Sequence, residues 1–383
     1  MIPAAVAVLN LDAVQHNLSK VRSCAPSAKI MAVIKANGYG HGMLRIAKAL
    51  QHVDAFAVAR VEEGINLRKA GIINRIAVLE GFSCDEELEG LLHYQLEPVV
   101  HSFTQLDILA NTKSLKPSSE GETPTAWLKI DTGMNRLGFR PADFKVAYQR
   151  LSQCPIIKQP INLMTHFANA DDINDGKTLK QINLFNETVA GFSGEHSLAN
   201  SAGILGWHES LSDWVRPGVM LYGISPFPDS TGAQLGLKPV MALYSRLIAV
   251  KQLEVGDTVG YGGSWICQKP TSLGVVAIGY GDGYPRYAKV GTPVLVNGQR
   301  VPLIGRVSMD MITVDLGSQI DAKPGDPVTL WGENLSIEEI AQWSDTIPYT
   351  LVCGVTQRVE LIEKRNLGGK DVDQHSESSI VIR

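Results

Sequence analysis

The chain has 383 residues, of which 44% are hydrophobic and 19% are charged, and its formal net charge at pH 7 is −4. This length predicts two domains, and the composition is that of a globular protein. The small negative charge excludes the basic surface that nucleic acid or an anionic membrane would require, so we expect a small-molecule partner.

The cysteines are odd in number, scattered and without a C-x-x-C pair, which argues against both a zinc site and a disulfide framework. They are Cys24, Cys84, Cys154, Cys267 and Cys353. Met1 to Leu11 lacks the basic start and long apolar core of a signal peptide, and no apolar run reaches the roughly 18 residues of a membrane span. These features predict a cytoplasmic protein.

The first part of the chain alternates between helical and strand patterns. Leu11–Cys24 has helical periodicity, with Asp12 as its expected cap. Short apolar runs, typical of buried strands, are Ile30–Ile34, Ala55–Ala59, Ile76–Leu79, Leu96–Val100, Ala126–Ile130, Ile161–Thr165, Ser197–Asn200 and Val215–Leu221. Helix-like segments between them include Glu62–Ala70, Glu86–Leu92 and Thr104–Ala110. This alternation predicts an α/β fold, a parallel (β/α)₈ TIM-type barrel over residues 1–235; a doubly wound open sheet is the rival and usually has fewer strands.

From about Gly236 the expected strands follow one another without helices between them. They are Tyr244–Val250, Leu273–Ile278, Pro293–Val296, Arg300–Ile304, Ile312–Val314 and Pro327–Leu330. Asn297-Gly298 is a hairpin signal, and Ser336-Ile337-Glu338-Glu339 is a capping box that predicts one helix. We therefore expect a mostly antiparallel β domain over residues 236–365, followed by a flexible tail over 366–383.

Lys35 is the first candidate for chemistry, because it stands at the carboxyl end of an apolar strand. A lysine that loses water there is biased toward its neutral, nucleophilic amine, which can form a Schiff base with an aldehyde cofactor. A glycine-rich turn carrying Tyr39 and His41 follows. An isolated strand-end lysine is more often simply solvated, so this interpretation depends on the rest of the chain.

Further polar groups follow the other expected strands, where the functional groups of a barrel gather. They are Asp131, Arg136, His166, Asn200, Ser201 and Arg216. Ser201 and the N–H groups of Gly218 and Val219 follow strands seven and eight, the usual phosphate position in barrels, whereas Pro217 has no N–H to offer.

Five motifs in this order resemble the alanine racemase family. They are Ala32–Gly42, Lys129–Gly138, Trp214–Gly218, Gly279–Gly283 and Gly305–Asp310. The resemblance runs from about Val6 to Leu361. It implies an isomerase that uses pyridoxal 5'-phosphate, with an amino-terminal barrel and a carboxy-terminal β domain, and that interconverts L-alanine and D-alanine.

The resemblance also implies a two-base reaction. Lys35 binds the cofactor and takes the α-proton of the D-isomer, and Tyr261 takes that of the L-isomer. His166 matches the partner of this tyrosine. Because Lys35 and Tyr261 lie in different domains, the family pattern implies a homodimer with two shared active sites.

Arg216 matches the residue that faces the pyridine nitrogen, where many such enzymes carry a carboxylate. A guanidinium only donates hydrogen bonds, so it leaves this nitrogen unprotonated and should suppress side reactions such as transamination. Ser197 departs from relatives that carry histidine near Arg216, which leaves the orientation of Arg216 open.

The remaining roles are carried over from the family in the same way. Arg136 and the N–H of Met309 would bind the substrate carboxylate, and Lys129, which many relatives carry as a carbamate, would hold Arg136, with His166 and Asn200 as other supporting residues. Tyr39, Ser201, Gly218, Val219 and Tyr349 would hold the cofactor phosphate. The entrance would be formed by Tyr280, Arg286, Arg306, Met309 and Asp310.

Three alternatives stay open. A racemase with a wider pocket would act on serine or lysine, because selection for a methyl side chain depends only on pocket volume. A decarboxylase of the same fold would need a carboxylate in place of Arg216. A noncatalytic cofactor carrier would need only the barrel. The sequence also leaves open whether the role is biosynthetic, supplying D-alanine for peptidoglycan, or catabolic.

Overall fold

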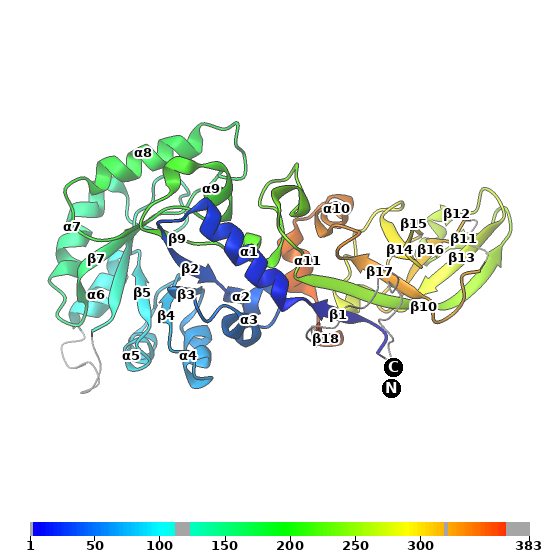
Figure 1. Cartoon of the computed structure of the whole chain (residues 1–383), viewed down its shortest axis with the longest axis horizontal. Coiled ribbons are helices and arrows are strands. Elements are labelled where there is room, and N and C mark those ends of the chain that lie inside the picture. Colours follow the sequence, from blue (N-terminus) through cyan, green and yellow to red (C-terminus); the bar gives the residue numbers. More distant parts are fainter. Residues whose placement is uncertain (1–2, 112–122, 318–320, 365–383) are drawn as a thin grey trace, which may run out of the picture. The chain divides into compact units, whose positions relative to one another are not determined.

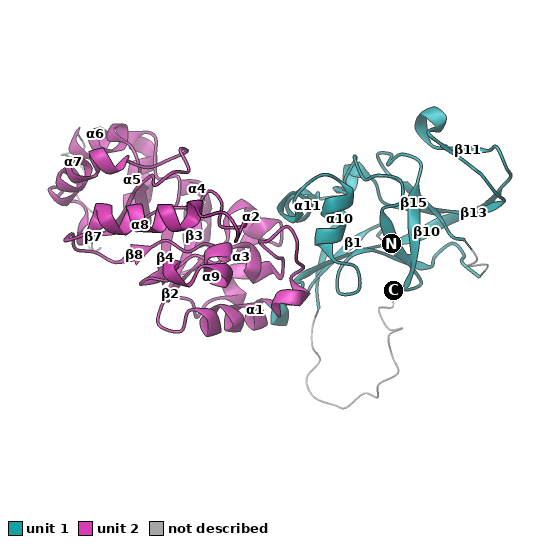
Figure 2. Ribbon diagram, turned by 90° about the horizontal axis from the view of Figure 1, so that it is seen from above, with its two compact units in different colours: residues 1–13, 239–383 teal, residues 14–238 magenta. Residues whose placement is uncertain are grey.

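The computed structural model describes residues 3–111, 123–317 and 321–364 (Figure 1). These residues form two compact units, one made from residues 14–238 and the other from the described residues of 1–13 and 239–383 (Figure 2). The expected tail over 366–383 lies outside the described residues. Within the described ranges, no helix is long and apolar enough to cross a membrane.

A closed barrel of eight parallel strands forms the core of the unit 14–238, which confirms the predicted barrel. Its strands are β2 (Lys29–Val33), β3 (Ala55–Val58), β4 (Arg75–Val78), β5 (Glu97–Val100), β6 (Thr125–Lys129), β7 (Lys158–Met164), β8 (His196–Ser197) and β9 (Trp214–Val215). The barrel is closed by β9, which pairs with β2. Most strand residues are buried, as expected for a parallel sheet covered on both faces.

Helices follow the barrel strands, and Figure 1 shows α4 to α8 outside them. The helices are α1 (Leu11–Cys24), α2 (Lys35–Tyr39), α3 (Met43–Ala49), α4 (Val61–Lys69), α5 (Asp85–His93), α6 (Phe103–Asn111), α7 (Pro141–Ser152), α8 (Lys177–Val189) and α9 (Ser201–Gly206). The expected cap of α1 was wrong by two positions: Asn10 Oδ1 accepts from the Ala13 N–H at 3.2 Å, and Asp12 lies inside the helix.

The last two barrel strands are shorter than predicted. The run over 215–221 forms a strand only to Val215, and Val219–Tyr222 is the 3₁₀ helix η2. Pro217 has no N–H to continue a strand ladder, although its carbonyl still accepts from the Val33 N–H at 2.9 Å. Arg216 therefore lies just past a strand rather than within one.

Charged and aromatic side chains close the amino-terminal end of the barrel. Arg75 pairs with the buried Glu97 and lies over the Trp214 ring. The indole N–H of Trp214 donates to Glu195 at 2.7 Å, and Lys29 also pairs with Glu195. This end is filled by structural contacts, which leaves the carboxyl end of the strands for a site.

The second unit is built on a mostly antiparallel sheet, as predicted. Its strands are β1 (Val6–Leu9), β10 (Met241–Leu253), β13 (Thr271–Val276), β14 (Pro293–Val296), β15 (Gln299–Ile304), β16 (Ile312–Asp315), β17 (Pro327–Trp331) and β18 (Glu360–Glu363), with β11 (Thr258–Val259) and β12 (Trp265–Ile266) as a separate pair. The order is β13-β16-β15-β14-β17-β10-β1-β18, and β13 also pairs with β10.

The amino-terminal strand β1 belongs to this second unit, which differs from the expected division at residue 235. It pairs antiparallel with β10 and parallel with β18, so backbone hydrogen bonds place residues 3–13 with the β domain. On the carboxyl side the units divide at 238/239. A four-residue strand carries too little pattern to reveal partners that lie over 230 residues away.

Two local predictions for the β domain are confirmed. Asn297 and Gly298 adopt φ values of 50° and 76°, as a tight hairpin between β14 and β15 requires. Ser336 caps α10 (Ile337–Trp343), where its hydroxyl accepts from the Glu339 N–H at 3.2 Å. The helix α11 (Pro348–Gly354) follows.

Candidate active site

Lys35 stands at the carboxyl end of β2, and an uncommon backbone follows it. Ala36, Asn37 and Tyr39 have φ values between 51° and 54°, and Gly38 has φ 64°. This is one turn of left-handed backbone, which costs about 1–2 kcal/mol for each residue other than glycine. Such a conformation persists only where surrounding contacts hold it.

Aromatic packing holds the far side of the turn. The ring of Tyr39 stacks on Tyr222 with centroids 4.7 Å apart, and the Tyr222 hydroxyl donates to the Val33 carbonyl at 3.2 Å. His41 Nδ1 lies 2.8 Å from the Tyr39 carbonyl and 3.1 Å from the Gly38 carbonyl, so Nδ1 carries the proton. Burial lowers the pKa of His41 to about 4, despite both carbonyls, and keeps the imidazole neutral.

A small polar cradle is formed where the Lys35 turn meets the chain after β9. Ser201 Oγ accepts from the Gly218 N–H at 2.9 Å and from the Met220 N–H at 3.3 Å. Both lone pairs of the hydroxyl are thereby used, so its proton is directed elsewhere, toward an acceptor. A Cβ on Gly218 would lie 2.8 Å from the Tyr39 hydroxyl oxygen. The cradle therefore offers hydroxyl donors to an anion and has no room for a side chain at Gly218.

Arg216 is buried and is held entirely by uncharged acceptors. Nη1 donates to the Ser197 carbonyl at 2.8 Å and to Ser197 Oγ at 2.6 Å, and Nη2 donates to the Thr165 carbonyl at 2.6 Å and the Leu198 carbonyl at 3.2 Å. Burial lowers the pKa of Arg216 to about 10, which still leaves it charged at neutral pH. Ser197 thus orients Arg216, and among the described residues nothing accepts from Nε.

His166 lies two residues after strand β7, beside Arg216. Its Nδ1 lies 3.4 Å from Arg216 Nη2, and because a guanidinium has no acceptor, Nδ1 accepts and Nε2 carries the proton. Burial, followed by the charges of Arg216 and Lys129, lowers the pKa of His166 well below its usual value. A neutral imidazole with an Nε2–H donor results.

Lys129, at the end of β6, is a buried lysine among cations. Burial, then Arg216 and Arg136, lowers its pKa to about 8, with Lys35 adding to the effect and Asp131 opposing it. Arg136 itself is exposed. Asp131 Oδ1 is engaged by the N–H groups of Gly133 and Asn135, both at 3.0 Å, which shapes the loop between Lys129 and Arg136.

The barrel therefore brings most of the predicted barrel residues to one end. His166, which follows β7, lies beside Arg216. Asn200 follows β8, and its side chain accepts from the Gly203 N–H at 2.9 Å. Val219, also predicted to hold a phosphate, is buried at the start of η2, whereas the Gly218 N–H predicted for the same role donates to Ser201 Oγ. Tyr349 lies in α11 of the other unit, so the structure does not unite it with these residues.

The remaining predicted residues gather on the β domain. Tyr261 lies in the short 3₁₀ helix η4 (Tyr261–Gly263) and is 70% exposed, and Met309 is 53% exposed. Tyr280 opens η5 (Tyr280–Asp282), and its N–H donates to the Ser308 carbonyl at 3.0 Å. Arg358 bridges Asp282 at 3.2 Å and Asp310 at 2.8 Å. These contacts hold the loops of Tyr280 and Met309 to each other.

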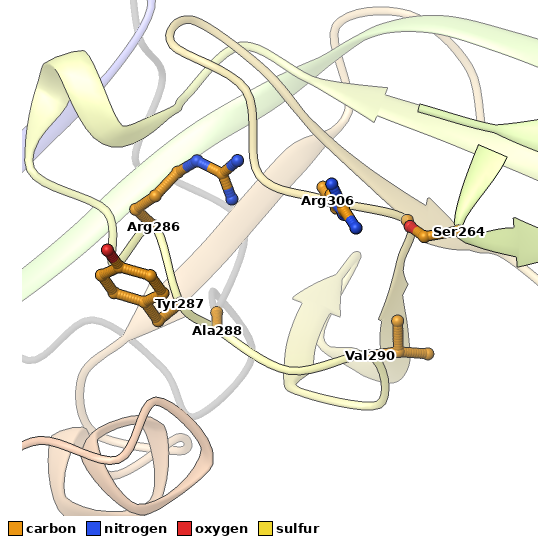
Figure 3. A pocket seen from close by; sticks show the side chains of 7 residues that line it. Ser264, Arg286, Tyr287, Ala288, Val290 and Arg306 are labelled. Atoms are coloured by element: carbon orange, nitrogen blue, oxygen red, sulfur yellow. The ribbon is translucent and has the colours of Figure 1, made fainter. Parts of the chain in front are cut away.

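A cavity of about 490 Å³ lies on the same domain. It is lined by Ser264, Arg286, Tyr287, Ala288, Val290, Gly305 and Arg306. Figure 3 shows the guanidinium of Arg286 extending on the side that faces Arg306. Two exposed cations beside one cavity suit an anionic small molecule, and both arginines are among the residues predicted for the entrance.

Three residues with clear roles here were missed by the sequence analysis. Tyr222 stacks on Tyr39, and Gln181 binds the His166 carbonyl at 3.2 Å and Thr132 at 3.1 Å. Glu63 accepts from the Ala36 N–H at 2.8 Å. Of the three, only Glu63 had a local sequence signal, because it is an acidic residue in the first turn of an expected helix. That signal does not reveal its contact with Ala36, which lies 27 residues away.

Comparison with known proteins identifies the family. The family descriptions "Alanine racemase, N-terminal domain" and "Alanine racemase, C-terminal domain" match residues 9–226 and 240–363. Alanine racemase of Vibrio vulnificus (strain CMCP6) is 51% identical over 94% of this chain and 98% of its own length. The biosynthetic alanine racemase of Escherichia coli O157:H7 is 50% identical with the same coverage.

Solved structures agree. The biosynthetic alanine racemase of Pseudomonas aeruginosa has a TM-score of 0.90 and 41% identity, covering 95% of this chain and 100% of that one. The Bartonella henselae enzyme, solved with covalently bound pyridoxal phosphate, has a TM-score of 0.84 and 27% identity, covering 94% and 99%. The chain belongs to the alanine racemase family.

Proposed function

We propose that this protein is a pyridoxal-phosphate-dependent racemase that interconverts L-alanine and D-alanine. The observation that supports this best is the carboxyl end of the barrel, where Lys35, the cradle of Ser201 and Gly218, and a buried Arg216 lie on neighbouring segments. Each group matches one part of pyridoxal phosphate: an aldehyde, a phosphate and a ring nitrogen.

The residues present fit this cofactor. The Ser201 hydroxyl is left as a donor toward a phosphate, with the Tyr39 hydroxyl beside Gly218. Arg216 offers its Nε–H, because among the described residues the four oxygen acceptors from Ser197, Thr165 and Leu198, together with His166, engage only Nη1 and Nη2. When bound, pyridoxal phosphate acidifies the α-proton of an amino acid joined to it by delocalising the carbanion's electrons.

Arg216 favours racemisation over related reactions. A buried guanidinium only donates hydrogen bonds, so it would leave the ring nitrogen unprotonated, which would make the ring a weaker electron sink and restrict the chemistry to proton exchange. A same-fold decarboxylase would need a carboxylate at this point. Arg216→Glu should therefore raise transamination relative to racemisation, measured as pyruvate formed per D-alanine formed; an unchanged ratio would count against this role.

Two bases on opposite faces of the α-carbon complete the proposed reaction. Lys35 Nζ exchanges the proton of the D-isomer, and the Tyr261 phenolate exchanges that of the L-isomer. The neutral His166, with its proton on Nε2, can donate to this phenolate while Arg216 fixes the imidazole through Nδ1. Arg136 and the Met309 N–H would hold the substrate carboxylate.

A homodimer with shared sites supplies Tyr261 in this proposal. Its support is that Tyr261 and Met309 lie exposed on the β domain while Lys35 lies in the barrel. Co-refolding Lys35→Ala chains with Tyr261→Phe chains should restore about a quarter of wild-type activity, because half of the dimers would carry one intact site of two. Sites built within one chain would give no restoration.

The decisive test of function uses the purified protein with pyridoxal phosphate and three substrates. D-isomer formation should be fast from L-alanine and weak from L-serine and L-lysine, and borohydride reduction should fix the cofactor on Lys35. Comparable turnover of all three would favour the broader racemase, and cofactor binding without turnover would favour a carrier. We further place the protein in the cytoplasm with a biosynthetic role in supplying D-alanine for peptidoglycan, since relatives named biosynthetic are about 50% identical.

A further inference from the structure

Glu63 connects the segment after Lys35 to the barrel through a single carboxylate. It is the third residue of α4, and its Oε2 accepts from the Ala59 N–H at 2.7 Å and the Arg60 N–H at 3.3 Å. Its Oε1 accepts instead from the Ala36 N–H at 2.8 Å. The two oxygens therefore serve different segments: Oε2 caps the start of α4, and Oε1 reaches the residue next to Lys35.

We propose that Glu63 is a positioning residue, which fixes the left-handed turn after Lys35 and thereby the direction of the Lys35 amine. This inference rests on the proposed function, because it assigns Glu63 to the same site. Glu63 touches neither substrate nor cofactor in this proposal and acts only through the backbone.

The location of the Ala36 N–H gives this contact its importance. This N–H belongs to the peptide group that joins Lys35 to Ala36, so it is the first backbone donor after the Lys35 side chain. Ala36 and Asn37 have positive φ without being glycine, and such residues return to right-handed backbone unless they are held. A charged acceptor makes a stronger and shorter hydrogen bond than a neutral one.

Other contacts hold parts of the turn that lie further from Lys35. The Gly38 N–H donates to the Ile34 carbonyl at 2.9 Å, and the Met43 N–H donates to Asn37 Oδ1 at 3.0 Å. Glu63 differs because Ala59, one of its partners on the α4 side, directly follows β3, the strand that pairs with β2. The carboxylate thus fastens the turn to the neighbouring strand of the barrel.

Glu63→Gln is the most informative variant. An amide has one acceptor oxygen and a donating NH₂ group, so it can cap α4 or accept from Ala36 but not both. Glu87→Gln is the matched control. Glu87 is the third residue of α5, the next barrel helix, and its Oε2 accepts from the Ser83 N–H at 2.6 Å and Ser83 Oγ at 2.8 Å, both local contacts.

Hydrogen exchange by mass spectrometry tests the contact itself, on the full-length protein with and without added pyridoxal phosphate. In Glu63→Gln, the segment 36–42 should exchange at least about tenfold faster than in wild type, since a hydrogen bond to a charged group is worth that much or more. The other barrel segments should keep their wild-type rates, and Glu87→Gln should leave segment 36–42 unchanged.

The loaded protein tests whether the turn positions Lys35. Glu63→Gln should raise the dissociation constant of pyridoxal phosphate by about tenfold and shift the pH midpoint of its visible absorbance, whereas Glu87→Gln should do neither. Wild-type exchange in segment 36–42 in both Glu63→Gln and Glu63→Ala, which has no side-chain acceptor, would overturn the inference, as would acceleration shared equally by the whole barrel. Faster exchange with unchanged cofactor affinity and midpoint would overturn it too. Because exchange is measured without cofactor as well, its result is separate from whether the protein racemises alanine.

Discussion

The sign of the effect of Lys129→Met on stability should show which chemical form Lys129 takes. Its pKa is lowered from 10.5 to about 8 by burial and by Arg216 and Arg136. A pKa difference of that size means that the ammonium form costs about 3 kcal/mol in the folded protein. At pH 7 about 10% of the amine is neutral, compared with about 0.03% for an ordinary lysine.

The neutral amine is the form that reacts with CO₂. The nitrogen bonds to the carbon of CO₂ and loses one proton to solvent, which leaves a carbamate anion between Arg136 and Arg216. We predict this form for Lys129. Removing one partner of a buried ion pair costs about 3–5 kcal/mol. Lys129→Met should therefore lower the free energy of unfolding by about 3 kcal/mol in CO₂-equilibrated buffer.

An unmodified lysine predicts the opposite result. The free-energy cost of burying its ammonium form is fully present below pH 8 and disappears as the pH rises from 8 to 10.5. In that range the folded chain has already lost the proton, whereas the unfolded chain still binds it. Lys129→Met would then stabilise the protein by up to about 3 kcal/mol at pH 7.

Urea unfolding at fixed protein concentration, in buffer equilibrated with CO₂ and in degassed buffer, measures this difference. The exposed Lys145→Met on α7 is the control, expected to stay within about 0.5 kcal/mol of wild type. A stabilised Lys129→Met in both buffers would refute the carbamate.

The other predictions concern the cradle, the closed end of the barrel and the second base. Gly218→Ala should raise the dissociation constant of pyridoxal phosphate by at least about tenfold, measured by fluorescence titration, because the new Cβ would lie 2.8 Å from the Tyr39 hydroxyl oxygen; unchanged affinity would contradict the cradle. Glu97→Ala should cost about 3–5 kcal/mol of stability in urea, since it leaves Arg75 without its buried partner; a loss below about 1 kcal/mol would show that this pair is solvated. Tyr261→Phe should lower the rate of racemisation at least about 100-fold while leaving the visible absorbance of the bound cofactor unchanged; near-normal turnover would exclude the phenol as a base.

The sequence determined the fold class and the order of the site. Apolar runs with helical segments between them require parallel pairing, and the polar residues that end those runs must then meet at one end of a barrel. This is why the sequence alone predicts that Lys35, His166 and Arg216 lie at the same end of the barrel. The hairpin at Asn297-Gly298 could also be predicted from local sequence. Its turn requires positive φ at both positions, and asparagine and glycine adopt positive φ readily.

Only the tertiary structure decided what holds these groups in place. Glu63 and Ala36 meet because β2 and β3 are neighbours, and the proton of His166 is located by the guanidinium of Arg216, which follows a different strand. The pKa of Lys129 likewise depends on charges that the chain brings together from distant positions. Local sequence specifies which segments form, whereas hydrogen bonds and electrostatic fields between segments exist only after the chain has closed on itself.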